Sequence, residues 1–260
     1  MNKILIYGIL NVTPDSFSDG GKFFSVDDAV EHALGMIFEG ADVIDIGGMS
    51  TRPGYDDVSE QEEQNRIIPV IKAIKHASPS CVISVDTFRS GTAKAALEAG
   101  ADIINDISGL MADPMMGRVI AEYNAKTVLM RDGFGNPDEG WKPMLQRTVV
   151  AAREAGIADG KIILDPGVGF TRTREQDMEL INAIPAIRDE WGYPVLLGVS
   201  RKRITAQFYK NASTADERLG ASLALAVYGV SLGASAVRVH DVKDTYAAIK
   251  AFEAAKGGSL

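Results

Sequence analysis

Residues 81–109 read CVISVDTFRSGTAKAALEAGADIINDISG, in which two apolar runs flank a longer segment that ends at Gly100. A glycine just before the second run fits the left-handed cap that closes many helices, where a side chain would be strained. A glycine followed by alanine also precedes two other apolar runs, at Gly40 and Gly233. The stretch is therefore typical of a strand, a helix and a second strand.

Strand-like and helix-like segments alternate along the whole chain. Short apolar runs are typical of buried strands, and they lie at residues 3–12, 42–48, 81–87, 102–109, 126–131, 161–169, 194–202 and 235–242. Segments with helical apolar spacing stand between these runs, for example at 25–41, 64–77 and 217–234. This alternation predicts a parallel sheet that is covered by helices.

The chain length and the number of strands favour a closed barrel. Eight strands and eight helices in 260 residues match the size of a single (β/α)8 TIM barrel, so we predict one domain over residues 1–260. The main alternative is a doubly wound open sheet, which usually has fewer strands and a glycine fingerprint after the first one. The first run continues as GILNVTPDS and does not match that fingerprint.

Composition limits the kinds of partner. Lys plus Arg (27) against Asp plus Glu (35) gives a net charge of −8 without long runs of either sign, so we expect no nucleic-acid surface. No apolar stretch approaches the ~18 residues of a membrane span, and the first residues lack a signal-peptide pattern. We therefore expect a cytoplasmic protein with no membrane partner. The single cysteine, Cys81, is predicted to be a buried structural thiol.

Nearly every predicted strand begins apolar and ends polar. The polar ends are Asn11, Asp45, Asp86, Asn105 with Asp106, Arg131, Asp165, Lys202 with Arg203, and Arg238 with His240. Any one of them could be a turn or cap residue. In a barrel, however, these ends meet on the face that carries catalytic residues. The convergence of so many polar residues indicates a functional site.

The residue types indicate what that site binds. Asp86, Asn105 and Asp165 supply hydrogen-bond acceptors and one amide that both donates and accepts, which suits a flat heterocycle with an amino-amide edge. The positive side chains suit phosphate or carboxylate groups, and they are Arg52, Lys202, Arg203, Arg238 and His240. Asp45 and Asp106 fit a structural role equally well, and we leave them outside the catalytic set.

Seven segments, in order along the chain, resemble the motifs of bacterial dihydropteroate synthases, a pterin-binding TIM-barrel family. They are GILNVTPDSFSDGGKF, GADVIDIGGMSTRPG, ISVDT, DIINDISG, ILDPGVGF, LLGVSRKR and AVRVHDV. The resemblance implies a transferase of folate biosynthesis. It would join 6-hydroxymethyl-7,8-dihydropterin pyrophosphate to p-aminobenzoate, giving 7,8-dihydropteroate and pyrophosphate, and would be inhibited by sulfonamides that mimic p-aminobenzoate.

The resemblance also implies residue roles. The catalytic residues would be Asp86, Asn105, Asp165 and Lys202, and these would bind the pterin together with Ile107, Met130 and Phe170. Asn11, Arg52, Arg238 and His240 would bind pyrophosphate, with Asn11 also touching Mg²⁺. The p-aminobenzoate site would contain Phe17, Thr51, Pro53, Lys202 and Arg203. Residues 13–24 and 49–57 would be long mobile loops after strands 1 and 2 that close over the substrates.

The chain departs from the family pattern at several positions. Arg131 ends the fifth strand where histidine is usual, Thr171 and Arg172 stand where Gly-Lys is frequent, Met49 replaces a common glutamate, and Arg203 replaces a frequent serine. None of these departures removes a residue that is expected to carry the central chemistry. Arginine at position 203 is a reasonable partner for the carboxylate of p-aminobenzoate.

Two alternative functions stay open on the sequence. A pterin-dependent methyltransferase would share the barrel and the pterin-binding residues but would have no use for the anion-binding segments. A degenerate pterin-binding protein without catalysis is the other alternative, motivated by Arg131, Thr171 and Arg172. The segment at 217–234 is apolar around more of its circumference than a barrel helix requires. It is either a well-buried helix or a homodimer surface, and the family resemblance implies a homodimer.

Overall fold

The computed structural model describes residues 3–13, 25–49, 58–133, 135–136, 139–211 and 214–257. Within these ranges, eight parallel strands form one sheet in the order β6-β5-β4-β3-β2-β1-β8-β7. They are β1 (Leu5–Asn11), β2 (Val43–Gly47), β3 (Val82–Asp86), β4 (Ile103–Asp106), β5 (Lys126–Met130), β6 (Ile162–Asp165), β7 (Leu196–Leu197) and β8 (Ala236–Val239). A bridge between Leu164 and Val195 joins the two edges and closes the barrel.

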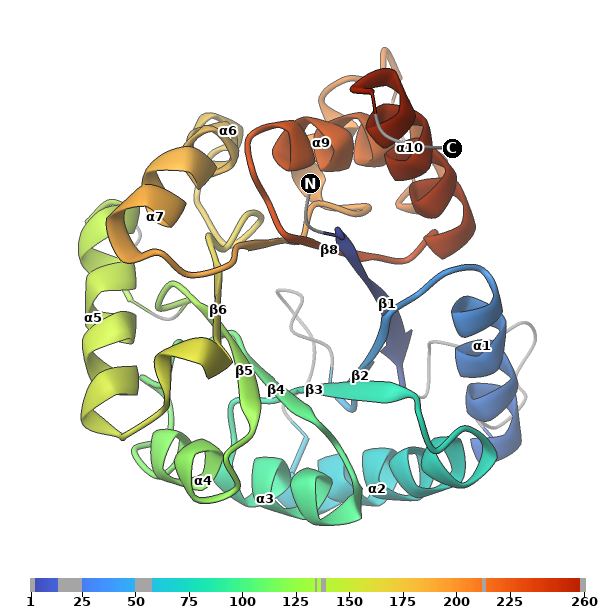
Figure 1. Cartoon of the computed structure of the whole chain (residues 1–260), viewed down its shortest axis with the longest axis vertical. Helices are drawn as coiled ribbons and strands as arrows, with labels where there is room; N and C mark the ends of the chain where they lie inside the picture. Colours follow the sequence, from blue (N-terminus) through green and yellow to red (C-terminus); the bar gives the residue numbers. More distant parts are fainter. Residues whose placement is uncertain are drawn as a thin grey trace.

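Helices surround this barrel on its outside, as Figure 1 shows. They are α1 (Val26–Phe38), α2 (Glu60–Ala77), α3 (Ser90–Ala99), α4 (Met116–Glu122), α5 (Trp141–Glu154), α6 (Arg174–Asn182), α7 (Ile184–Trp191), α8 (Arg203–Ala206), α9 (Leu219–Ser231) and α10 (Val242–Ala255), with short 3-10 turns at Asp159–Lys161 and Asp216–Arg218. Two helices follow each of β6 and β7, which exceeds one helix per strand. The predicted (β/α)8 barrel is confirmed.

The glycines that were predicted to end helices adopt the left-handed conformation. Gly100 closes α3 with φ of 112°, and its N–H bonds the carbonyls of Ala96 and Leu97. Gly40 and Gly233 lie just past α1 and α9 with φ of 111° and 106°. A side chain at such angles would be strained, so glycine is needed there.

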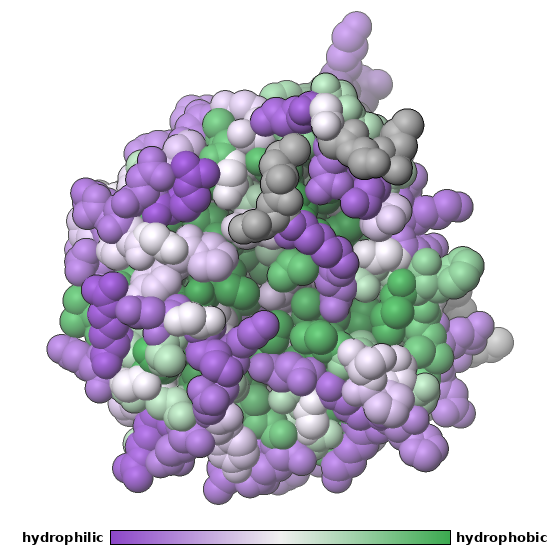
Figure 2. Space-filling model, viewed as in Figure 1, coloured by the Kyte–Doolittle hydropathy of each residue, from purple (hydrophilic) through white to green (hydrophobic). Residues whose placement is uncertain are grey.

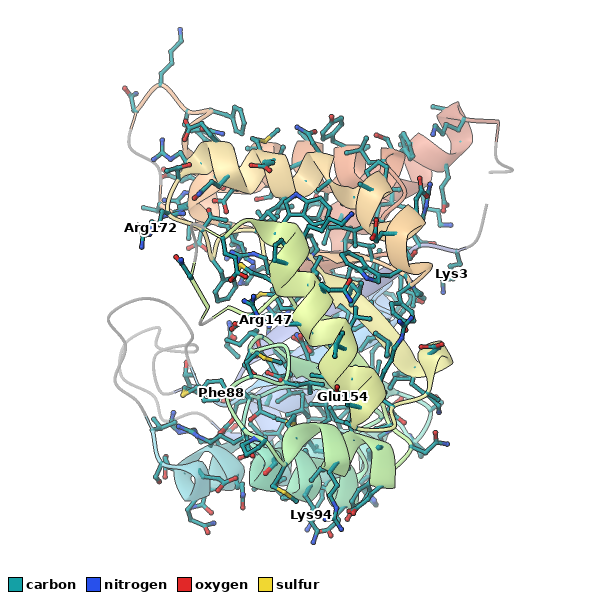
Figure 3. The ribbon with its side chains drawn as sticks, turned by 90° about the vertical axis from the view of Figure 1, so that its left-hand side faces the viewer. Lys3, Phe88, Lys94, Arg147, Glu154 and Arg172 are labelled. Atoms are coloured by element: carbon teal, nitrogen blue, oxygen red, sulfur yellow. The ribbon has the colours of Figure 1, made fainter. Side chains whose placement is uncertain are left out.

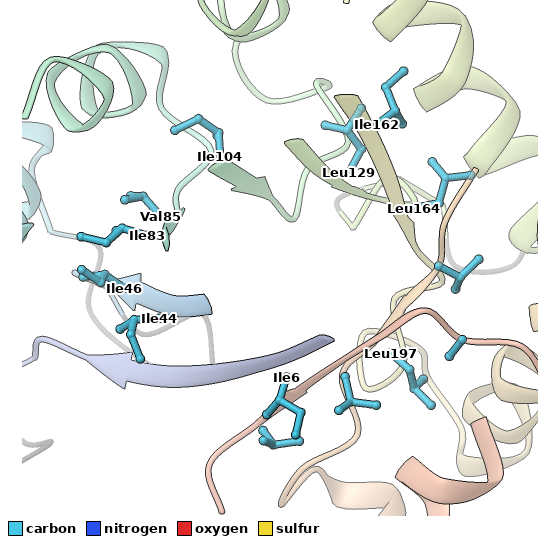
Figure 4. Packing of buried hydrophobic residues seen from close by; sticks show 14 of the residues in the cluster. Ile6, Ile44, Ile46, Ile83, Val85, Ile104, Leu129, Ile162, Leu164 and Leu197 are labelled. Atoms are coloured by element: carbon cyan, nitrogen blue, oxygen red, sulfur yellow. The ribbon is translucent and has the colours of Figure 1, made fainter. Parts of the chain in front are cut away.

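Side-chain alternation along the strands separates two apolar regions. Residues that point outward, such as Ile44, Ile46 and Ile83, pack between the sheet and the helices (Figure 4). Residues that point inward, such as Tyr7 and Val128, form a second cluster inside the barrel. Because strand side chains alternate between two faces, one strand supplies both regions. The last inward-pointing residue of each strand is then available for a site at the end of the barrel.

The seventh strand differs from the prediction. The run at 194–202 was expected to be one strand with Lys202 and Arg203 at its end, but β7 covers only Leu196 and Leu197. Arg201 has a φ of 59° in the turn that follows, and Arg203 begins α8. Lys202 therefore reaches the barrel mouth from a loop rather than from a strand.

Hydrophilic side chains cover most of the rim of the face seen in Figure 2, and hydrophobic ones are visible mainly between them. Among the described residues, no helix is both long enough and apolar enough to cross a bilayer. Cys81 is buried as predicted, and burial raises the pKa of its thiol to about 11. Most of the two loops predicted to be mobile, at 14–24 and 50–57, lies outside the described residues.

Candidate active site

Strand register brings the predicted polar residues together. Asp86 at the end of β3 pairs with Asn105 of β4, and Met130 at the end of β5 pairs with Asp165 of β6. Because parallel strands of a barrel all end on one side, these residues occupy the same mouth. Adjacent strands thus place a carboxylate, an amide and a second carboxylate around one opening.

The two ends of the barrel can be told apart in Figure 3. Phe88 and Arg172, in the loops that follow β3 and β6, lie toward one side of that view, and Lys3, which precedes β1, lies toward the other. The first side is the carboxyl end of the strands, where catalytic residues of such barrels are found.

Arg238 of β8 connects two carboxylates across the mouth. Its Nε donates a 2.6 Å hydrogen bond to Oδ2 of Asp45, and its Nη2 donates one of 2.8 Å to Oδ2 of Asp86. Burial works against the charged guanidinium, but Asp45 and Asp86 outweigh it and raise the pKa of Arg238 above its ordinary value. Arg238 therefore stays charged at any physiological pH.

The two carboxylates differ in their surroundings. Asp45 has no exposed surface and also lies 3.3 Å from Nδ2 of Asn105, which donates to it. The Asp86 side chain is 12% exposed. Burial raises the pKa of Asp86 to about 7, because the Arg238 charge offsets only part of the desolvation and Asp45 adds repulsion. One guanidinium faces two carboxylates, so Asp86 is poised to exchange a proton near neutral pH.

Asp165 and Lys202 form a second charged group at the mouth. Oδ1 of Asp165 accepts a 2.7 Å hydrogen bond from the N–H of Gly167, as a turn residue would. Burial raises the pKa of Asp165 although Lys202 lowers it in part, and burial lowers the pKa of Lys202 against the effect of Asp165. A β-carbon on Gly198 would lie 3.6 Å from Nζ of Lys202 and 4.0 Å from Oδ2 of Asp165, so glycine leaves the space beside these groups open.

Apolar side chains border this group. Met130 is buried and pairs in register with Asp165, and Ile107 is buried on the neighbouring loop. The ring of Phe170 has its centroid 5.0 Å from Nζ of Lys202. A β-carbon on Gly133 would lie 2.5 Å from Cε of Met130 and 2.6 Å from the carbonyl oxygen of Ile107, so these two walls meet there.

His240 follows β8 and is oriented by Ser200. The Ser200 hydroxyl accepts the backbone N–H of His240 at 3.2 Å and lies 3.0 Å from Nδ1 of its ring. These two contacts with one hydroxyl fix the orientation of the imidazole ring.

Comparison with known proteins shows the family of this chain. A family model described as pterin binding enzyme matches residues 7–240. A dihydropteroate synthase from Clostridium beijerinckii is 46% identical over 253 residues, which covers 95% of this chain and 93% of that protein. The chain belongs to the dihydropteroate synthase family. Members at this level of identity are transferases.

Solved structures of the family share the fold. Dihydropteroate synthase from Xanthomonas albilineans with 4-aminobenzoic acid has a TM-score of 0.91 and 37% identity, covering 99% of this chain and 94% of that one. The Yersinia pestis enzyme in a sulfonamide drug complex has a TM-score of 0.87 and 36% identity, covering 98% of this chain and 94% of that one. The family fold therefore extends over nearly the whole chain.

Asn11 is the predicted magnesium ligand of this dihydropteroate synthase family member. A β-carbon on Gly47 would lie 3.7 Å from the amide oxygen of Asn11 and 3.8 Å from Cβ of Asp86, so Asn11 borders the Asp86 side of the mouth. Mg²⁺ accepts such an oxygen while keeping waters and substrate phosphates as its other ligands. The described residues contain no cluster of three or more acidic, histidine or cysteine ligands. The donor set fits a metal shared with a phosphate-bearing substrate.

The predicted p-aminobenzoate site of the family is only partly described. Phe17, Thr51 and Pro53, and with them the pyrophosphate ligand Arg52, lie outside the described residues. Nζ of Lys202 donates a 2.5 Å hydrogen bond to the carbonyl of Val168. The Arg203 guanidinium donates to the carbonyl and hydroxyl of Thr171 and faces Asp177. Both cations are thus bound within the protein.

Sequence reasoning missed one residue and left two others out of the site. Asp45 was left out, although its place two residues before Gly47 in β2 puts it on the inward face. Ser200 was missed because its partner, His240, is distant in sequence and no local pattern joins them. Asp106, also left out, accepts the N–H groups of Ser108 and Leu110 at 2.7 and 2.9 Å, so it shapes the turn after β4.

Proposed function

We propose that this enzyme transfers the methylene carbon of 6-hydroxymethyl-7,8-dihydropterin pyrophosphate to the amino group of p-aminobenzoate. The carbon–oxygen bond breaks with its electron pair on pyrophosphate, a carbon–nitrogen bond forms, and the amine gives up one proton. One observation carries the proposal: a single barrel mouth holds Asp86, Asn105 and Asp165 beside the cations Lys202 and Arg238. This set matches a hydrogen-bonding ring that bears an anionic group.

The pterin ring would bind between the Asp86–Arg238 pair and the Asp165–Lys202 pair. Asp165 would accept from the 2-amino and N3–H edge, using Oδ2 on the side that Gly198 leaves open. Lys202 would donate to the carbonyl and N5 side of the ring. Asn105, which already donates to Asp45, would orient another ring position. Buried groups prearranged in this way bind a complementary ring strongly, because an analogue that cannot pair leaves them unsatisfied.

The leaving group would lie toward β1 and β8. Arg238 supplies a permanent positive charge, and the oriented imidazole of His240 supplies a further hydrogen-bonding group. Mg²⁺, when held by Asn11 and the substrate phosphates, would neutralise charge on the departing pyrophosphate. These groups favour the transition state because charge on pyrophosphate grows as the carbon–oxygen bond breaks.

Asp86 is the group that would stabilise the carbon left behind. Bond cleavage puts positive charge on the methylene, spread into the ring, and an ionised carboxylate nearby stabilises it more than it stabilises the ground state. An arylamine is neutral at physiological pH, so the attack needs no general base to prepare it. Asp86 would act in its ionised form, which dominates above a pKa of about 7 in the ligand-free protein.

The decisive experiment measures pyrophosphate release with both substrates and with each alone. The synthase requires release that depends on p-aminobenzoate as well as on the pterin. Asp86→Asn should lower turnover far more than it weakens pterin binding. Equal losses in both would remove the assigned role of Asp86, and absence of release would favour a degenerate pterin-binding protein.

The pterin-dependent methyltransferase alternative has less support. Arg238 and His240 are the residues that we propose for binding pyrophosphate, and a methyl transfer would have no use for such a pair. The relative named above is a dihydropteroate synthase, and it matches 95% of this chain. Methyl transfer to an acceptor without pyrophosphate release would reverse this choice.

The described surface supports a homodimer. Phe208 and Tyr228 are 57% and 41% exposed, and they line a groove of about 400 Å³ with Leu225 of α9. Apolar exposure of this kind is typical of partner surfaces. Light scattering that shows a monomer at micromolar concentration would contradict the dimer. The cytoplasmic location and sulfonamide binding stay predictions of the same assignment.

A further inference from the structure

The loop between β6 and α6, residues 166–173, is held by charged side chains that lie outside it. Nη2 of Arg131 donates a 3.0 Å hydrogen bond to the carbonyl of Phe170. Nζ of Lys202 donates one of 2.5 Å to the carbonyl of Val168. Arg203 donates to the carbonyl of Thr171 and, at 3.0 Å, to its hydroxyl. Arg131, Lys202 and Arg203 thus come from two other parts of the chain, and each donates to a different backbone carbonyl of this one loop.

Asp177 in the first turn of α6 is the anion of this cluster. Its side chain has no exposed surface. Oδ1 accepts the N–H of Gly169 at 2.7 Å and the Thr171 hydroxyl at 2.6 Å, and Oδ2 lies 3.5 Å from Nε of Arg203. A buried carboxylate is costly unless nearby charges and hydrogen bonds compensate it. Arg203 supplies the paired charge, Arg131 adds an electrostatic attraction, and the loop supplies the hydrogen bonds.

The same loop forms one side of the proposed pterin site. It carries Phe170, whose ring centroid lies 5.0 Å from Nζ of Lys202. A β-carbon on Gly169 would lie 2.6 Å from Cδ of Lys202, so the loop backbone packs directly against the lysine stem. A shift of this loop would therefore move both the aromatic wall and the ammonium group.

We propose that Asp177, with Arg131 and Arg203 as its cationic neighbours, is a positioning residue for pterin binding. It fixes the loop at 166–173 so that Phe170 and the Lys202 ammonium face the ring. This role rests on the proposed function, because it assumes that the mouth binds a pterin. Asp177 itself contacts the loop and not the substrate.

The departures from the family pattern support a cluster that works as a unit. Arg131, Thr171 and Arg203 are all departures, and all three belong to this cluster. Arg203 and Thr171 contact the Asp177 carboxylate, and Arg131 binds the same loop at Phe170. Residues joined through one loop and one buried carboxylate are coupled energetically, so their substitutions are not additive. We expect the double variant Arg131→His/Arg203→Ser to raise the Kd for the pterin by less than the product of the fold-changes in the two single variants.

The main experiment measures binding of 6-hydroxymethylpterin by calorimetry. Asp177→Ala removes all three contacts of the carboxylate, whereas Asp177→Asn keeps an oxygen for Gly169 and Thr171 but removes the charge. We expect Kd to rise at least ~10-fold for alanine and ~3-fold for asparagine, the scale of a lost buried hydrogen-bond group. Arg131→Met, which removes the bond to Phe170 at similar volume, should raise Kd ~5-fold by the same reasoning.

Asp102→Asn is the matched control. Asp102 accepts the N–H of Ile83 at 2.9 Å and pairs with Lys75 at 2.8 Å, but it precedes β4 at the opposite end of the barrel. It should lower the melting temperature without changing the Kd for the pterin. If Asp177→Ala does not fold, Asp177→Asn and Arg131→Met decide the matter.

The pH dependence of binding gives a readout that a purely structural role would not move. Burial lowers the pKa of Lys202, and the positive charge of Arg238 lowers it further. The carboxylates of Asp165, Asp177 and Asp86 raise it. Asp177→Asn should therefore move the alkaline loss of pterin affinity to lower pH. Wild-type Kd values in both Asp177→Asn and Arg131→Met would overturn the positioning role and leave the synthase function standing. Failure of the wild-type protein to bind the pterin would overturn both.

Discussion

Nε of Arg238 lies 2.6 Å from Oδ2 of Asp45, a carboxylate that has no exposed surface. Asp45 therefore holds the guanidinium from a buried position that substrates cannot reach. Its Nη2 is left to bind Asp86 at the mouth, 2.8 Å away. Asp45 sets both the position of Arg238 and the electrostatic field at Asp86.

Asp45→Asn should therefore change both stability and pH dependence. Asparagine keeps a hydrogen bond to Arg238 but loses the charge, so we expect unfolding in urea to require about 2 kcal/mol less free energy. Repulsion from Asp45 raises the pKa of Asp86, so the acid limb of kcat/KM should move to lower pH in the variant. An acid limb in its wild-type place would show that the two carboxylates are not coupled.

The pKa of Asp86 also predicts how stability depends on pH. It is raised from 3.8 to about 7, so between these pH values the folded protein keeps a proton that the unfolded chain releases. Stability from this group is therefore lost as pH rises through that window. The wild-type protein should lose stability relative to Asp86→Asn between about pH 4 and about pH 7. Parallel unfolding curves for the two proteins would contradict the raised pKa.

The sequence predicted Asp86 and Asn105 because each ends an apolar run, and strand register then places them side by side. Asp45 was harder to place, because a charged residue within a strand can face inward or outward until its partners are known. Its partner, Arg238, comes from the last strand, so only closure of the barrel reveals the pair.

The seventh strand shows a second limit of local patterns. Its apolar run continues past Leu197, yet the backbone leaves the sheet before Lys202. Arg201 binds Asp241 through two hydrogen bonds of 3.1 and 2.6 Å, and it holds this loop against the loop after β8. Arg203 was predicted to face p-aminobenzoate, but whether its guanidinium does so depends on Asp177 and Thr171, which no local pattern links to it.

Gly198→Ala should obstruct the proposed pterin site without harming the fold. The added methyl group would lie 3.6 Å from Nζ of Lys202 and 4.0 Å from Oδ2 of Asp165, which are ordinary contacts. It would occupy space meant for the ring edge, so we expect the KM for the pterin substrate to rise ~10-fold at an unchanged melting temperature. Gly160→Ala, where a β-carbon meets nothing within 4 Å, is the control. An unchanged KM would place the ring elsewhere.

Cys81 should react slowly with thiol reagents. Burial raises its pKa to about 11, so at pH 8 only about one thiol in a thousand is ionised. We expect the folded protein to react with a chromogenic disulfide at least ~100-fold more slowly than the urea-unfolded chain. Equal rates would mean that the segment around Cys81 opens readily.

Sulfonamide binding should depend on pyrophosphate. Of the predicted p-aminobenzoate residues, the described ones are Lys202 and Arg203, and both already donate to the loop at 166–173. A carboxylate or sulfonyl group arriving alone must displace those bonds. Residues 13–24 and 49–57, if they close over the bound anion as predicted, would supply new contacts instead. Binding of the anion and of the sulfonamide would then be positively coupled.

Calorimetric titration of a sulfonamide, with and without pyrophosphate plus 6-hydroxymethylpterin, measures this coupling. We expect affinity to rise at least ~10-fold when both are present, equivalent to about 1.4 kcal/mol. Arg52→Ala and Phe17→Ala should each remove most of the gain while pterin binding stays nearly intact. Arg118→Ala, which removes an exposed arginine paired with Glu122 on α4, should leave the gain unchanged. Equal sulfonamide affinity under both conditions would show that pyrophosphate does not help to build the second site.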